Sequence, residues 1–94
     1  MDSDALVERL RPLLKELPEP ESSDAARVLE LIVSPGEDDR RELNRLTELL
    51  GRRTARAVPF AVLGRARLAE LTGSPRDAAA LPIDCERRLE LIGY

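Results

Sequence analysis

The sequence has no histidine, no tryptophan and a single cysteine, Cys85. Without histidine, the chain has no His-based zinc site and no Ser–His or Cys–His catalytic pair. One cysteine excludes an intramolecular disulfide, and with no base to activate it Cys85 is expected to be a small core residue. We therefore predict that the protein is not an enzyme and takes no cofactor and no small-molecule substrate.

Long apolar runs are also missing. The longest nearly uncharged stretch, residues 57–64, is far too short to cross a bilayer. The first residues are acidic and lack the apolar segment of a signal peptide. Asp38 and Asp39 are adjacent, and neighbouring side chains on a helix point about 100° apart, so these carboxylates do not converge on a metal ion. We expect no metal site, no membrane contact and a cytoplasmic location.

What the sequence does contain is aliphatic residues and mixed charge. Of its 94 residues, 43% are hydrophobic, with one phenylalanine and one tyrosine, so the core is built mainly from leucine, alanine and valine. These residues suit helix-on-helix packing better than a sheet. We predict an all-α fold in which residues 1–94 form one domain, a compact bundle of five to seven short helices.

The first half predicts two helices separated by a loop. Leucines recur at helical spacing over residues 3–17, where Pro12 predicts either a kink or two short helices in series. We expect a loop over residues 18–23 and the remaining helices over residues 24–92. The next helix is expected to begin where the loop ends, near Ser22 or Ser23, and to end at about Val33. A short central strand at its end is the alternative, although no second strand is visible to pair with it.

The second half predicts further helices separated by proline and glycine. The third helix of the chain is expected over residues 37–50, at the centre of the bundle and followed by Gly51 as its stop. Beyond it we expect a short turn interrupted by Pro59 and a helix ended by Gly73. These are followed by a helix that begins at Ser74 and is cut short by Pro82, and by a last helix over residues 84–92 that is ended by Gly93.

Charge is distributed unevenly along the chain. Residues 1–49 carry a net charge of −6, whereas residues 50–94 carry +3. Arginine presents a planar fork that suits phosphate or carboxylate groups, so the arginines of the second half are the candidate binding residues. The alternative interpretation is a solvated face, neutralised in part by the acidic first half. The candidates are Arg52, Arg53, Arg56, Arg65, Arg67 and Arg76.

Residues 68–79 resemble the core of a bacterial helix-turn-helix. Ala69 supplies the small residue of the first helix and Gly73 the glycine of the turn. The resemblance implies that the helix after the turn reads DNA. Ser74 departs from the apolar residue usual at its position, and the reading helix is rich in alanine, which puts base recognition in doubt.

Size, helix number and the missing catalytic groups predict a non-enzymatic interaction module. The chain is similar in these respects to small adaptor domains of the death-fold type, and that similarity implies binding to a protein partner or to another copy of the chain. The alternative is a small helix-turn-helix-like DNA-binding regulator or antitoxin, whose arginine-rich second half contacts phosphate.

Overall fold

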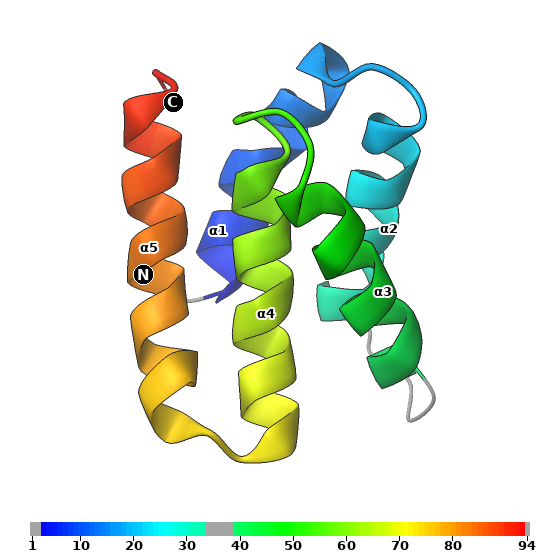
Figure 1. Cartoon of the computed structure of the whole chain (residues 1–94). Coiled ribbons are helices and arrows are strands. Elements are labelled where there is room, and N and C mark those ends of the chain that lie inside the picture. The colour runs from blue at the N-terminus through cyan, green and yellow to red at the C-terminus, as the bar shows by residue number, and fades with distance from the viewer. Residues whose placement is uncertain (1–2, 34–38, 94) are drawn as a thin grey trace.

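The chain folds into helices that lie in two layers (Figure 1). The structure is a computed structural model and describes residues 3–33 and 39–93. Every regular element in this part of the chain is helical, which confirms the all-α prediction and rules out a strand before Val33. The elements are α1 (Ser3–Leu10), the 3₁₀ helix η1 (Arg11–Glu16), α2 (Glu21–Val33), α3 (Asp39–Gly51), α4 (Val58–Thr72) and α5 (Pro75–Leu91).

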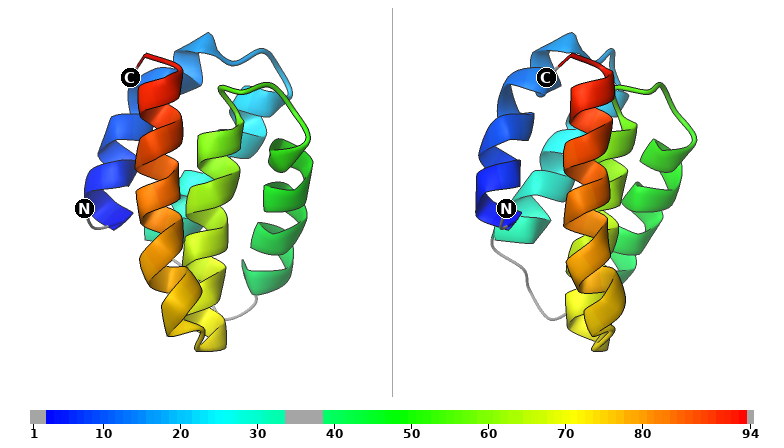
Figure 2. Two further views of the ribbon diagram at one scale, coloured as in Figure 1. Left: turned by 60° about the vertical axis from the view of Figure 1, so that its left-hand side comes forward. Right: turned by 90° about the vertical axis from the view of Figure 1, so that its left-hand side faces the viewer.

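Helix α4 is the central element. It lies between α3 and α5 in one layer, and α1, η1 and α2 form the layer behind it (Figures 1 and 2). It packs against α1, α2, α3 and α5, and its residues 59–64 are all buried. The prediction that the third helix is central was therefore wrong. Helix α3 has apolar residues on one face only, whereas the first half of α4 is apolar on every side.

Pro12 divides the first helical segment as expected. Helix α1 ends at Leu10, and Pro12 lies in the first turn of η1, where a missing backbone N–H costs nothing. The tighter 3₁₀ winding turns Leu13 and Leu17 into the core behind Leu6 and Leu10. The loop that follows is shorter than predicted, since α2 begins at Glu21.

Pro59 and Pro82 behave differently from the prediction. Pro59 does not interrupt a helix but lies in the first turn of α4, so one helix replaces the predicted turn and separate helix. Pro82 lies inside α5, which continues through it to Leu91. The interior proline removes one backbone hydrogen bond, and the extensive packing of α5 on α4 holds the helix together across the gap.

Gly64 sets the distance between α3 and α4. A Cβ atom at this position would collide with Cγ2 of Thr47 and would lie 3.4 Å from both Leu43 Cδ1 and Val28 Cγ1. Thr47 is itself buried, and its hydroxyl donates to the carbonyl of Asn44 at 2.9 Å. The missing side chain at Gly64 thus allows three helices to meet closely at one point.

The glycine stops were predicted with mixed success. Gly73 and Gly93 follow α4 and α5 with φ of +77° and +89°, the left-handed conformation that ends helices. Gly51 is instead the last residue of α3 and does not adopt positive φ. The predicted start of α3 at residues 37–38 lies outside the described residues, and α3 is seen from Asp39 onward.

Candidate interaction surface

The connection between α3 and α4 displays most of the predicted arginines at one end of the bundle. Arg52, Arg53 and Arg56 lie in this connection, residues 52–57, and all three are exposed. Arg65 is exposed on α4 and extends toward the same end: a Cβ atom at Gly51 would come within 2.9 Å of its Nη2 atom. We call Arg52, Arg53 and Arg65 the arginine corner.

Two contacts anchor the connection that carries the corner. Arg56 forms an ion pair with Glu16 of η1 at 3.4 Å. Thr54 donates a hydrogen bond through Oγ1 to Oε2 of Glu21, at 3.4 Å, and Glu21 is buried at the start of α2. The backbone adds a turn in which the N–H of Ala57 donates to the carbonyl of Thr54 at 2.9 Å. Contacts with η1 and α2, together with this internal turn, therefore hold the backbone from which the connection presents its arginines.

The arginine corner has no acidic partner within residues 3–33 and 39–93. None of its three side chains makes an ion pair or hydrogen bond there. Their positive charge is favourable near the C-terminus of α3, because the last carbonyl groups of a helix carry partial negative charge. Elsewhere, Arg11, Arg27 and Arg88 pair with glutamate or aspartate. The corner is therefore a local excess of positive charge.

The two remaining candidates lie apart from the corner. Arg67 pairs with Glu70 at 2.7 Å, and its Nε atom is buried without a hydrogen-bond partner in the described part of the chain. Arg76 lies in the first turn of α5, at the end of the bundle opposite the α3–α4 connection (Figure 1). The structure therefore brings together four of the six predicted arginines, counting Arg56.

Two further arginines, which the charge pattern of the sequence did not indicate, extend the corner along α3. Arg41 and Arg45 are exposed and, like the corner, make no ion pair within the described ranges. When the spacing of 100° per residue is extended one residue past the end of α3, each lies within about 20° of Arg52 around the helix axis. Leu49, 37% exposed, borders this row, and Glu48 lies within it. We call Arg41, Arg45 and Arg52 the α3 ridge.

The segment that resembles a helix-turn-helix is a hairpin in three dimensions. Helices α4 and α5 run antiparallel and lie side by side along their length (Figures 1 and 2). A DNA-reading helix of that motif must stand at a large angle to its predecessor in order to enter the major groove. Residues 68–79 therefore lack the arrangement that the resemblance to a helix-turn-helix implies.

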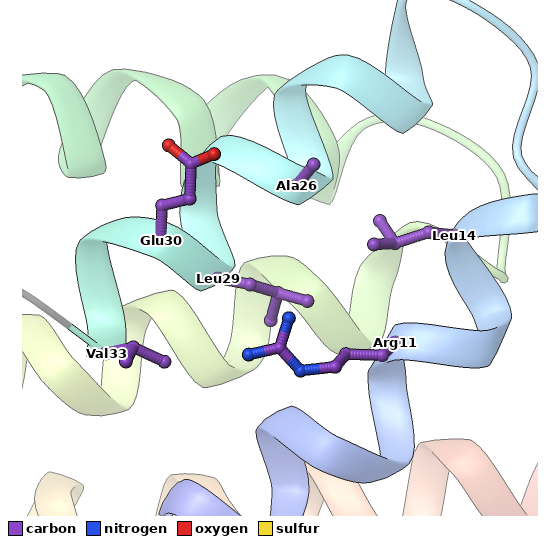
Figure 3. Close-up of a pocket in the computed structure, with 6 residues that line it drawn as sticks. All are labelled: Arg11, Leu14, Ala26, Leu29, Glu30 and Val33. Atoms are coloured by element: carbon purple, nitrogen blue, oxygen red, sulfur yellow. The ribbon is translucent and has the colours of Figure 1, made fainter.

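A groove of about 290 Å³ lies between η1 and α2 (Figure 3). Its charged rim is already engaged, because Arg11 pairs with Glu8 at 3.0 Å and Glu30 pairs with Arg27 at 3.1 Å. The groove therefore offers mainly apolar contact. Its lining residues are Arg11, Leu14, Ala26, Leu29, Glu30 and Val33.

Cys85 is a core residue. Its side chain is fully buried, and Sγ lies 3.4 Å from the carbonyl oxygen of Pro59. Burial raises the pKa of the Cys85 thiol to about 12, so the thiol stays protonated at neutral pH and is a poor nucleophile. Within the described ranges, no three histidine, cysteine or acidic side chains converge as metal ligands would. No helix in those ranges combines the length and apolar character needed to cross a bilayer.

Comparison with models of known protein families, with curated proteins and with solved structures finds no match to this chain.

Proposed function

We propose that this protein is a non-enzymatic helical interaction module of the cytoplasm that binds an acidic segment of a protein partner through the arginine corner. One observation carries the proposal: three exposed arginines gather at the end of α3 with no acidic partner in the described chain, while the arginines of α2 and η1 are paired. Arginine binds carboxylates through two parallel N–H···O bonds, so an unpaired cluster suits an acidic ligand.

The anchoring of the α3–α4 connection supports this proposal. The contacts of Arg56 with Glu16 and of Thr54 with Glu21 hold the backbone of the corner before any partner arrives. A preformed site loses less conformational entropy on binding than a flexible loop. The corner can therefore contribute to affinity with few contacts.

A nucleic-acid ligand is the competing function, and two observations disfavour it. The chain carries a net charge of −3, which repels a polyanion. The hairpin of α4 and α5 has no projecting helix to enter a groove. A short acidic peptide segment needs only local complementarity, which the corner offers.

Fluorescence anisotropy with two labelled peptides tests the proposal. One probe is a glutamate-rich peptide, and the other replaces every glutamate with glutamine. We expect the first to bind at low salt and the second not to bind. The double variant R52E/R53E is expected to weaken binding of the acidic probe about tenfold or more, because it turns attraction into repulsion.

The matched control is R76E/R87E, which reverses two exposed arginines of α5 that make no ion pair within residues 3–33 and 39–93. Helix α5 lies on the other side of α4 from α3 (Figure 1). Both variants change the net charge of the chain by the same amount. If binding depends only on overall charge, the two variants weaken it equally, and that result would contradict the proposal. Duplex DNA of the same charge serves as a third probe. If the DNA binds more tightly than the acidic peptide, with a steep loss between about 50 and 200 mM salt, the nucleic-acid function replaces the one proposed here.

A further inference from the structure

The binding surface does not end at the corner. Arg41 and Arg45 lie on the same side of α3 as Arg52, and the row from Arg41 to Arg52 covers about 16 Å at 1.5 Å per residue. All three are exposed, and none has an ion-pair partner in the described chain. The α3 ridge is thus a row of unpaired cations along α3, with Arg41 and Arg45 on the helix and Arg52 in the turn directly after it.

The ridge also has an apolar neighbour. Leu49 is 37% exposed and lies about one turn before Arg52, next to the row of arginines. The opposite face of α3 is committed to the core through Leu43, Leu46 and Leu50. The exposed face therefore combines positive charge with one aliphatic contact, the pattern found where an amphipathic helix lies against another helix.

We infer that the α3 ridge is the docking face for an acidic amphipathic helix of the partner, which lies along α3 and presents carboxylates to Arg41, Arg45 and Arg52 and an apolar side chain to Leu49. This inference rests on the proposed function and specifies the shape of the ligand. Glu48 lies within the ridge and favours this ligand over a phosphate backbone, because a helix can place an uncharged or basic side chain opposite it.

The partner's length follows from the same geometry. A helix that reaches from Arg41 to Arg52 needs about three turns. Isolated helices shorter than about 12–15 residues are marginal in water, so the probe should be about 20 residues long and rich in alanine. Its glutamates and one leucine are placed on one face at the spacing of the ridge and Leu49. A scrambled peptide of the same composition keeps the charge and destroys that face.

The experiment measures binding of the patterned and scrambled peptides to the full chain and to three variants, R41E/R45E, L49S and R52E/R53E. We expect the patterned peptide to bind at least about tenfold more tightly than the scrambled one, and R41E/R45E to remove that difference. L49S is expected to weaken binding of the patterned peptide about threefold or more, since the substitution removes an apolar contact from a half-exposed site. Helix content by circular dichroism verifies that each variant folds.

The outcomes separate this inference from the proposed function. If R52E/R53E weakens binding but R41E/R45E does not, and both peptides bind equally, the ridge is not a docking face although the corner still binds acid. If neither double variant changes binding, the proposed function fails as well. If light scattering shows that the chain dimerises and that R41E/R45E abolishes the dimer, the ridge binds a second copy and the inferred partner is wrong.

Discussion

The close packing of Gly64 against Thr47 allows a specific prediction about the free energy of unfolding. Replacement of Gly64 by alanine adds a Cβ atom that collides with Cγ2 of Thr47 and is in van der Waals contact with Leu43 and Val28 at 3.4 Å. Overpacking of a core costs about 1–3 kcal/mol. Alanine is the better helix former by about 1 kcal/mol, which offsets part of that cost. We expect Gly64→Ala to lower the free energy of unfolding by about 1 kcal/mol.

The companion variant Thr47→Ser removes the obstructing methyl group and keeps the hydroxyl that donates to Asn44. On its own it loses one buried methyl, at a cost of about 1 kcal/mol. In the double variant the new Cβ atom of residue 64 fills the space that the methyl vacates. We expect the two losses to be non-additive by about 1 kcal/mol, with the double variant more stable than their sum predicts.

Urea unfolding followed by circular dichroism measures the three variants. Gly51→Ala is the matched control, because it is the same change in the neighbouring helix, and the nearest atom that its Cβ meets belongs to the flexible end of Arg65. It is expected to lie within about 0.5 kcal/mol of the parent protein. A Gly64→Ala protein that is as stable as the parent, or additive losses in the double variant, would refute the close approach of α3 and α4.

Three further predictions concern single groups. Burial raises the pKa of Cys85 to about 12, against about 8.5 for an unfolded cysteine. Above about pH 8.5 the unfolded chain loses the thiol proton that the folded protein keeps, so the free energy of unfolding falls by up to about 1.4 kcal/mol per pH unit as pH rises toward 12. Urea titrations at several pH values should show this slope in the parent protein and not in Cys85→Ala. Hydrogen bonds from Ser22 and Ser23, at 2.5 and 2.6 Å, hold the pKa of Glu19 below its usual value. Their stabilisation is present above the unfolded pKa and is lost as pH falls through the folded one, and an NMR titration should show the midpoint rising in S22A/S23A. Gly73→Ala forces alanine into positive φ and should lower the free energy of unfolding by about 1 kcal/mol in urea titrations, without changing peptide binding.

Each of these three predictions has a result that contradicts it. Equal pH slopes in the parent and the Cys85→Ala protein would mean that the thiol is not buried. An unchanged Glu19 midpoint in S22A/S23A would mean that the serine hydroxyls do not reach its carboxylate. A Gly73→Ala protein as stable as the parent would mean that the turn after α4 does not need a left-handed residue.

The prolines show where local sequence signals suffice and where they fail. Each of Pro12, Pro59 and Pro82 lacks a backbone N–H and has a fixed φ, so each is expected to kink or end a helix. Only Pro12 does so. Pro59 is placed at the start of α4, where it costs nothing, and Pro82 is carried through α5 by packing against α4. Whether a proline ends a helix, begins one or lies inside one depends on tertiary contacts, and these cannot be read from a short stretch of sequence.

The sequence indicated only some of the arginines in the proposed binding surface, for a comparable reason. Adding charges along the chain found Arg52, Arg53 and Arg65, because no acid separates them in sequence. The same sum hid Arg41 and Arg45, since acidic residues dilute them in the first half. Counting charges around the axis of the predicted third helix would have placed both beside Arg52. The position of Arg76 at the far end required knowledge of how α4 and α5 turn.

NMR mapping of the acidic helical peptide on the labelled full chain locates the bound surface residue by residue. We expect addition of the peptide to shift the amide signals of Arg41, Arg45, Leu49 and the arginine corner. Signals of the outer face of α5, where Ile83 and Leu91 are 62% and 79% exposed, should stay in place. Shifts concentrated on α5 or on the groove between η1 and α2, with α3 unchanged, would contradict the account.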